Sequence, residues 1–505
     1  MPRPALVLGT LSLDAAAGPK QRQLYAALRD AVLTGRLAPG ARLPSTRALA
    51  AELGVGRNTV VAAFEQLVAE GYVTARIGDG TRVARLAPEA HLEARRPAVR
   101  PAVRRVGPPP TLSSRGRALV ATPRPGPWVE PRAFQTGRPA LEQFPHAVWG
   151  RLVARRARRP PVSALGYSHA AGQPVLREAI AAYLGGARGV PCTPAQVIVV
   201  AGAQAGLDLA CRLLADAGDR AWLEDPGYTG ARGAFSAAGL RAVPVPVDDD
   251  GLDVAAGIRL APDARLVHVT PSHQFPLGVT MPLARRLALV EWAERAGAWV
   301  VEDDYDSEFR YAGRPLAAMA GLAPGGRVVH LGSFSKTMFA ALRAGWLVVP
   351  EALAGGFEVA LRHTGHTVPA VVQAALADFL VEGHFAAHLR RMRVLYAARQ
   401  ARLLRALARR LGGVAQAVPA DTGMQLPVWL PDGSDDLAVS RAAFAARVVA
   451  QPLSALFVGR TRRPGLFLGY GGVPERDIDD GVARLAGVVR AHLPARSVAR
   501  AQGRC

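Results

Sequence analysis

A chain of 505 residues is too long for one ordinary hydrophobic core, so we expect two or three domains. Half of its residues are apolar, but no stretch of about twenty lacks charges and the N-terminus has no signal-like block, which argues against a membrane protein and for a cytoplasmic one. The net charge of +22 suggests a polyanionic partner, and three cysteines without metal-ligand spacing indicate reduced thiols rather than a metal centre.

The first part of the chain carries a helix-turn-helix pattern. Apolar residues recur at helical spacing from Gln21 to Leu37, and a second helix is predicted from Thr46 to Leu53, with Ser45 as its N-cap. After the break at Gly54-Val55-Gly56 a third helix begins, and its predicted buried stripe consists of Val60, Phe64, Leu67 and Val68. Two short helices joined by a glycine-containing turn are typical of proteins that place the second helix in the major groove of DNA.

A β-hairpin is predicted directly after these helices. Residues 72–77 alternate, the chain turns at Gly78-Asp79-Gly80, and residues 81–83 return, as in the wing of a winged helix. The segments Leu43-Pro44-Ser45-Thr46-Arg47 and Gly54-Val55-Gly56-Arg57-Asn58-Thr59-Val60, followed by Glu70-Gly71-Tyr72, resemble the GntR family of winged-helix repressors. We therefore expect a DNA-binding domain over residues 10–85.

The GntR resemblance also implies which side chains contact double-stranded DNA. Phosphate contacts would supply most of the affinity, and base contacts would select the operator sequence. The implied residues are Arg42, Ser45, Thr46, Arg47, Arg57, Asn58 and Thr59. A helical protein–protein module with a solvated arginine face is the alternative.

Residues 86–130 are rich in proline, arginine and alanine and show no apolar periodicity, so we expect a semi-rigid, basic linker. From residue 131 to 495, short apolar runs alternate with helical lengths, which predicts an α/β domain with a mainly parallel sheet. Polar clusters follow four of these runs, where ligands of such sheets bind. The clusters are Asp225–Tyr228, Thr270–Gln274, Glu302–Tyr305 and Ser333–Lys336.

Lys336 belongs to one of these clusters, and lysine is rare in this chain. Of 62 basic side chains only Lys20 and Lys336 are lysines. Arginine serves ion pairs and phosphate contacts at least as well, so a chain that uses it almost everywhere needs lysine mainly for a neutral primary amine that forms a Schiff base. The position after an apolar run suits a phosphorylated aldehyde cofactor, although the arginine bias could also reflect genome composition alone.

The ordered motifs together resemble the fold-type I aminotransferases that use pyridoxal 5′-phosphate. These motifs are Gly202-Ala203-Gln204, Glu224–Tyr228, Thr270–Gly278, Glu302–Glu308, Ser333–Lys336 and Leu342-Arg343. Behind a GntR-like winged helix, the whole chain resembles the MocR class of bacterial transcriptional regulators. The resemblance implies a homodimer that binds an operator and senses the cofactor and an amine or amino-acid effector.

The aminotransferase resemblance implies a role for each site residue. Lys336 would carry the cofactor, Asp303 would face the pyridine nitrogen and keep the ring an electron sink, and Tyr228 would stack on the ring. Tyr305 would bond the ring oxygen, and Gln274, with His273 as a second candidate, occupies the place beside that oxygen where related enzymes have an asparagine. The phosphate would be held by Ala203, Gln204, Ser333 and Arg343, with Tyr167 from the neighbouring subunit.

Two other kinds of site fit parts of the same motifs. Ser333-Phe334-Ser335-Lys336 has the Ser-x-x-Lys spacing of penicillin-interacting enzymes, but those also need a Lys-Thr-Gly element, which a chain with two lysines lacks. The acidic run Glu302–Asp306 could bind a metal, but residues on a strand alternate between faces and no oxygen-rich calcium loop is present. We expect no metal site.

The chain departs from aminotransferases where the substrate carboxylate binds. Phe467 stands in the position of the usual arginine, with Arg462 and Arg463 as nearby substitutes. Gln425 replaces a histidine often seen in MocR-like chains, and Ala340 replaces a proline. These departures favour a sensor that binds without turnover. The alternatives are a working aminotransferase with an accessory DNA-binding domain and a regulator that has lost the cofactor.

Overall fold

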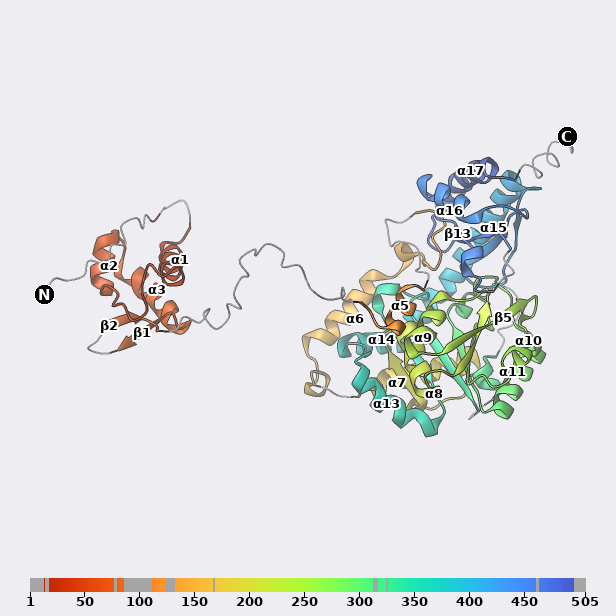
Figure 1. The fold of residues 1–505 in the computed structure, drawn as a ribbon, viewed down its shortest axis with the longest axis horizontal. Helices are drawn as coiled ribbons and strands as arrows, with labels where there is room; N and C mark the ends of the chain where they lie inside the picture. Colours follow the sequence, from red (N-terminus) through yellow and green to blue (C-terminus); the bar gives the residue numbers. More distant parts are fainter. Residues whose placement is uncertain are drawn as a thin grey trace. The chain divides into compact units, whose positions relative to one another are not determined.

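The computed structural model describes residues 13, 18–76, 80–85, 111–122, 132–166, 169–311, 317–323, 326–459 and 463–494. The chain divides into two compact units, Met1–Pro110 and Thr111–Cys505 (Figure 1).

The N-terminal unit contains three helices and a two-stranded sheet. Its elements are α1 (Lys20–Leu33), α2 (Thr46–Leu53), α3 (Arg57–Ala69), β1 (Val73–Arg76) and β2 (Gly80–Val83). The Ser45 hydroxyl caps α2 by accepting a hydrogen bond of 3.1 Å from the Ala48 amide, and Gly54 ends the helix in the left-handed conformation. The second predicted helix therefore has the bounds expected from the sequence.

The core of this unit is formed by the apolar stripes of its helices. Leu24 and Leu28 of α1 and Val60, Phe64 and Leu67 of α3 are buried together. The prediction that Val68 is buried is wrong, since its side chain is 41% exposed. Val68 follows Leu67 by one residue, which is about 100° around the helix and off the buried stripe.

Strands β1 and β2 pair antiparallel, with Val73 opposite Val83 and Arg76 opposite Gly80. The predicted wing hairpin is thus present in its strands, while Gly78 and Asp79 of its predicted turn lie outside the described residues.

The C-terminal unit contains a large sheet that has eight strands among the described residues. In spatial order these are β3 (Val197–Val200), β10 (Gly345–Val348), β9 (Val328–Ser333), β8 (Trp299–Asp304), β7 (Leu266–Val269), β4 (Arg220–Asp225), β5 (Arg241–Asp248) and β6 (Gly251–Leu252). Strands β9, β8, β7, β4 and β5 run parallel. Strand β10 is antiparallel to both of its neighbours, and β6 is antiparallel to β5. The sheet is mainly parallel, as the sequence predicted.

Helices cover both faces of this sheet because its strands are apolar on both faces (Figure 1). Trp222 and Leu223, successive residues of β4, lie in different core clusters. The helices of this layer are α7 (Pro174–Arg188), α8 (Ala203–Leu214), α9 (Thr229–Ala238), α10 (Val254–Leu260), α11 (Leu283–Ala296), α12 (Met319–Leu322), α13 (Glu351–Thr364) and α14 (Ala370–Val381).

A smaller sheet completes the unit. Its strands, in spatial order, are β11 (Gln416–Ala417), β12 (Gln425–Trp429), β14 (Gly465–Gly469) and β13 (Gln451–Pro452). The long helix α15 (His384–Leu411) packs on α17 (Glu475–Ala491), with α16 (Asp436–Ala445) beside them. Gln425 is the first residue of β12, and its side chain accepts a hydrogen bond from the Gly137 amide.

Two further helices precede the large sheet, α5 (Ser114–Val120) and α6 (His146–Arg158). Helix α5 lies within the segment 86–130 that we expected to be a linker, and it packs beside α9. The domain boundaries drawn from the sequence stay predictions.

Within the described part of the chain, no single helix is both long and apolar enough to cross a membrane. The bent pair α14 and α15 meets that criterion only when the two helices are taken together, by length and composition alone.

Candidate functional site

The predicted polar clusters follow the carboxyl ends of neighbouring parallel strands. Asp303 ends β8, Tyr228 follows β4, and Lys336 follows β9 three residues after Ser333. Since β4, β7, β8 and β9 are parallel and adjacent, these side chains gather at one edge of the sheet. The structure therefore brings Lys336, Asp303, Tyr305 and Tyr228 into one site.

Lys336 is mostly buried and its amine donates a 2.9 Å hydrogen bond to the carbonyl oxygen of Gly137. Burial lowers the pKa of Lys336 below its ordinary value, although the carboxylates of Asp306 and Asp303 act in the opposite direction. A buried amine with a lowered pKa is more often neutral near physiological pH, and the neutral form is the nucleophile. Sequence reasoning did not find Gly137, because it lies 199 residues from Lys336 along the chain.

Asp303 is buried and only half satisfied. Its Oδ2 lies 3.2 Å from Nε2 of His268, on the neighbouring strand β7, whereas its Oδ1 has no hydrogen-bond partner among the described residues. A buried carboxylate oxygen without a partner is costly, so it is suited to a donor supplied by a ligand. A protonated ring nitrogen is such a donor.

The aromatic ring of Tyr228 lies beside this carboxylate. Burial raises the pKa of Tyr228 to about 12, the Asp303 carboxylate acts in the same direction, and the Arg343 guanidinium opposes them. The Tyr228 hydroxyl lies 3.3 Å from Oε1 of Gln204, and the Gln204 amide donates to the carbonyl of Gly230. The ring is therefore fixed as a neutral, flat surface next to Asp303.

The start of helix α8 and Arg343 form a cradle suited to an anion. Gly202 precedes α8 with φ of +91° and offers no side-chain cap, so the first amides of the helix, at Ala203 and Gln204, lack an acceptor from a capping side chain. A Cβ on Gly202 would come within 3.9 Å of the Arg343 guanidinium. Arg343 itself has a φ of +50°, a left-handed conformation that is uncommon for a residue other than glycine.

Ser333 completes the predicted phosphate group of residues and is buried at the end of β9. Its Oγ donates to Oγ of Ser335 at 3.0 Å and accepts from the Ser335 amide at 3.1 Å. Tyr167, the remaining predicted phosphate ligand, lies outside the described residues.

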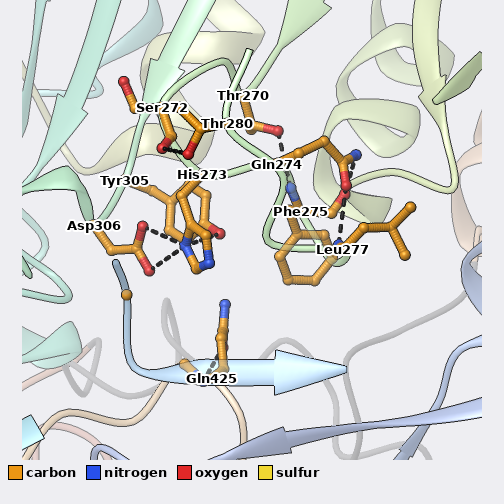
Figure 2. Close-up of polar contacts among 12 residues, drawn as sticks. Thr270, Ser272, His273, Gln274, Phe275, Leu277, Thr280, Tyr305, Asp306 and Gln425 are labelled. Atoms are coloured by element: carbon orange, nitrogen blue, oxygen red, sulfur yellow. Dashed lines mark hydrogen bonds and ion pairs between the residues drawn. The ribbon is translucent and has the colours of Figure 1, made fainter. Parts of the chain in front are cut away.

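His273, Asp306 and Tyr305 form a buried network near Lys336 (Figure 2). Nδ1 of His273 lies 2.9 and 3.0 Å from the two carboxylate oxygens of Asp306 and 3.0 Å from the Tyr305 hydroxyl. Burial and the Asp306 carboxylate raise the pKa of Tyr305 well above its ordinary value, and a hydrogen bond from Gln425 opposes them. Tyr305 is therefore a neutral phenol.

Gln274 is occupied within its own loop. Its amide nitrogen donates to the carbonyls of Pro226 and Phe275 at 2.9 and 2.7 Å, and its oxygen accepts from the Leu277 amide at 3.0 Å (Figure 2). Both N–H groups are used by backbone carbonyls, so Gln274 has no donor left for a ring oxygen. The Gln274 side chain therefore stabilises the loop that contains His273 and Phe275.

The rest of the acidic run is distributed among separate partners. Glu302 accepts from the amides of Met319 and Ala320, and Asp304 pairs with Arg188 at 2.7 Å in the protein interior. Across the described residues, no group of three or more His, Cys, Asp or Glu side chains is placed to hold a metal ion.

The position expected to bind a substrate carboxylate is apolar. Phe467 in β14 is 1% exposed and belongs to a small cluster with Leu453 and Leu456. Its ring meets that of Phe275 edge to face at 5.2 Å. The Arg463 guanidinium lies over the Trp429 ring, 4.3 Å from its centre, and Arg462 lies outside the described residues.

The candidate DNA surface lies on the N-terminal unit. Arg57, Asn58 and Thr59 form the first turn of α3, and the first two are exposed. Arg42, Ser45 and Arg47 are also exposed, and Thr46 and Thr59 are half-buried. The start of a helix exposes amides and side chains that bind phosphates and base edges.

A DNA-binding winged helix joined to an aminotransferase fold is the class that these features define, and known proteins share both parts. Residues 20–83 match the bacterial regulatory proteins of the gntR family, and residues 153–463 match aminotransferase class I and II. The probable rhizopine catabolism regulatory protein MocR of Rhizobium meliloti is 45% identical over 92% of this chain and 93% of its own length. The pyridoxine biosynthesis regulator PdxR of Corynebacterium glutamicum is 34% identical over 89% of this chain and 91% of its own length.

Solved structures match the C-terminal unit. The α-aminoadipate aminotransferase LysN of Thermus thermophilus, complexed with N-(5′-phosphopyridoxyl)-L-leucine, has a TM-score of 0.66 at 30% identity over 75% of this chain and 95% of its own. The Pyrococcus horikoshii kynurenine aminotransferase has a TM-score of 0.67 at 28% identity over 73% and 93% of the two chains. The chain belongs to the MocR-type transcriptional regulators, in which a GntR-type DNA-binding domain precedes an aminotransferase-like domain.

Proposed function

We propose that this regulator carries pyridoxal 5′-phosphate on Lys336 and that its affinity for an operator changes when an amine or amino acid reacts with that cofactor. The observation that carries the proposal is the buried Lys336 amine with a lowered pKa, near Asp303, whose Oδ1 lacks a partner among the described residues. The aminotransferase class I and II fold and the phosphopyridoxyl complex of the Thermus enzyme imply the cofactor.

The residues present fit that cofactor. Asp303 would receive the pyridine N–H, Tyr228 would cover the ring, and the start of α8 with Arg343 would hold the phosphate. When bound, the cofactor supplies an aldehyde carbon that exchanges one primary amine for another. Lys336 would be the resident amine, and its lowered pKa keeps it ready to return.

The apolar setting of Phe467 favours sensing over turnover. An aminotransferase must hold the carboxylate of its substrate while the amino group reacts, and a buried phenylalanine ring cannot bind a carboxylate. The alternative, a working aminotransferase with an accessory DNA-binding domain, predicts steady conversion of an amino donor and a keto acid.

The first experiment compares the visible absorbance of the purified full-length chain with pyridoxal 5′-phosphate before and after Lys336→Ala. We expect a band of lysine-bound cofactor that Lys336→Ala lacks. Lys20→Ala is a matched control, because Lys20 is the other lysine of the chain and begins α1 in the N-terminal unit. A band that persists in Lys336→Ala, or that depends on Lys20, would overturn the proposal.

A second experiment tests the operator contacts. We expect Arg57→Ala to weaken DNA binding uniformly across sequences and to reduce the salt slope by about one, as the loss of a phosphate contact does. Asn58→Ala should instead relax the choice between operator variants. Arg476→Ala, which removes an exposed arginine of the other unit, serves as the control.

We further propose that the chain acts in the cytoplasm as a homodimer that reads paired half-sites. The support is the family relationship, since a symmetric dimer places two winged helices on one operator. Sedimentation of the full chain at micromolar concentration tests it, and a monomer bound to a single half-site would contradict it.

A further inference from the structure

His273 and Gln425 approach the Tyr305 hydroxyl, and Asp306 holds His273. His273 belongs to the loop after β7, Asp306 follows β8, and Gln425 begins β12 in the smaller sheet (Figure 2). All three are buried. Their hydrogen bonds decide which way the Tyr305 hydroxyl points.

The hydrogen on His273 is located by Asp306. Both oxygens of the Asp306 carboxylate lie within 3.0 Å of Nδ1, and a carboxylate can only accept. Nδ1 therefore carries the hydrogen and has no lone pair to offer. Because the Tyr305 oxygen is also 3.0 Å from Nδ1, it shares that hydrogen as an acceptor.

Gln425 approaches the same hydroxyl with a donor. Its Oε1 accepts a 3.0 Å hydrogen bond from the Gly137 amide, which assigns the other end of the side chain as the NH₂ group. Figure 2 shows this nitrogen pointing toward the rings of His273 and Tyr305. The Gln425 side chain lowers the pKa of the phenol against the effect of burial, which is the direction expected of an N–H that faces the phenol oxygen.

Tyr305 thus faces an N–H donor on each of two sides. Its own hydrogen cannot point at either neighbour, and among the described residues no acceptor for it is found. We propose that His273 and Gln425 are positioning residues that turn the Tyr305 hydroxyl into a hydrogen-bond donor toward an anionic oxygen of the cofactor. The proposal rests on the function proposed above and adds two residues to it.

The same arrangement connects the hydroxyl to the lysine. The amide of Gly137 is bound by Gln425 and its carbonyl by Lys336, so one peptide segment joins both groups. Gly423, two residues before Gln425, lies against His273, and a Cβ there would come 2.2 Å from Cε1 of the imidazole. A side chain at position 423 would therefore displace His273.

The test is a double-mutant cycle on cofactor affinity in the full chain, measured by titration with pyridoxal 5′-phosphate. Gln425→Glu keeps the acceptor for Gly137 but replaces the donor with a carboxylate, to which Tyr305 would give its hydrogen. We expect about a tenfold rise in the dissociation constant for Gln425→Glu and for Tyr305→Phe, each from the loss of one hydrogen bond. In the Tyr305→Phe background, Gln425→Glu should have less than about a twofold effect.

Two further variants separate positioning from folding. Gln425→Met removes the donor without adding a charge, and it replaces Gln425→Glu in the cycle if the new carboxylate unfolds the site. Its effect on the dissociation constant should also disappear in the Tyr305→Phe background. Gln373→Met removes another buried glutamine, whose partners among the described residues are backbone groups at Val368 and Gln173, and it should leave the dissociation constant unchanged. A wild-type chain without the cofactor band would overturn the proposed function and this assignment together. A normal wild-type band with the full Gln425 effect retained in Tyr305→Phe would overturn this assignment alone.

Discussion

The two sides of the site differ in chemistry although they lie close together. On one side, Asp303 has an oxygen without a hydrogen-bond partner among the described residues, and Lys336 has a buried amine. Both groups are available to a ligand. On the other side, Phe467 and Phe275 meet edge to face and Arg463 lies over Trp429, so the side chains satisfy one another. A polar group held without a partner costs free energy, and a chain keeps one where a ligand compensates for it.

This contrast separates binding of the cofactor from turnover of a substrate. A regulator needs a cofactor that can exchange amines, and it needs the two states of the site to differ in free energy. It does not need to fix a substrate carboxylate for repeated reaction. If the contrast holds, substitutions on the first side change cofactor affinity and substitutions on the second side change stability.

The largest expected effect is on stability and comes from the apolar side. Phe467→Ala removes a buried ring from the cluster with Leu453 and Leu456, which should lower the free energy of unfolding by about 3–5 kcal/mol. The dissociation constant for pyridoxal 5′-phosphate should change much less than the stability, because Phe467 reaches the rings of Tyr228 and Tyr305 through Phe275. Chemical denaturation and cofactor titration measure the two quantities. A large loss of affinity for pyridoxal 5′-phosphate in Phe467→Ala would show that the apolar side also contributes to cofactor binding, and it would contradict the distinction between the two sides.

The opposite pattern is expected for Asp303→Asn. The substitution keeps the shape but removes the charge that faces a protonated ring nitrogen, which should weaken cofactor binding by about 1.5–3 kcal/mol. The free energy of unfolding without cofactor should change little, because an asparagine oxygen can still accept from Nε2 of His268 and the Oδ1 atom has no hydrogen-bond partner to lose among the described residues. Asp263→Asn, at an exposed ion pair with Arg220, is the control for a carboxylate removed elsewhere.

Whether a contact of the candidate site could be predicted from the sequence depended on how far apart its residues lie along the chain. Lys336, Asp303 and Tyr228 lie at ends of strands, and the rule that parallel strands end at one edge predicted that they meet. Lys336 was marked further by the scarcity of lysine. The Gly137 carbonyl and the Gln425 amide come from segments 199 and 288 residues away from their partners, and no local pattern encodes such a contact.

Two features of the structure were not predicted from the sequence, for different reasons. The amide of Gln274 serves its own loop, which depends on backbone carbonyls that no side-chain motif reveals. Val68 was placed in the core of the winged helix because it is apolar, although one helical step turns it to solvent.

A third prediction concerns pH and Lys336. Its pKa in the folded chain lies below 10.5, so the folded state releases this proton before the unfolded state does, and stability without cofactor should rise with pH through that interval. The rate of cofactor uptake should rise with the neutral amine and level off below pH 10.5. Asp306→Asn removes a carboxylate that raises this pKa and should move the midpoint to lower pH. A midpoint that moves upward would contradict the described charge arrangement.

The smallest expected effect decides whether the apolar side is truly without a carboxylate anchor. Arg463 was a candidate to replace the missing arginine, but its guanidinium stacks on Trp429, a contact that contributes about 0.5–1 kcal/mol. Arg463→Ala should therefore reduce stability by no more than that amount. Arg327→Ala should cost more, because the Arg327 guanidinium lies over Trp299 and also donates a 3.2 Å hydrogen bond to the Gly297 carbonyl. Spectral titrations of the cofactor-loaded chain with alanine and with ethylamine, which differ by a carboxylate, provide the decisive comparison. If Arg463 only stacks, the preference between the two amines will be the same in the wild type and in Arg463→Ala. If the wild type prefers alanine and Arg463→Ala loses that preference, Arg463 is a carboxylate anchor, and the second side of the site binds substrate after all.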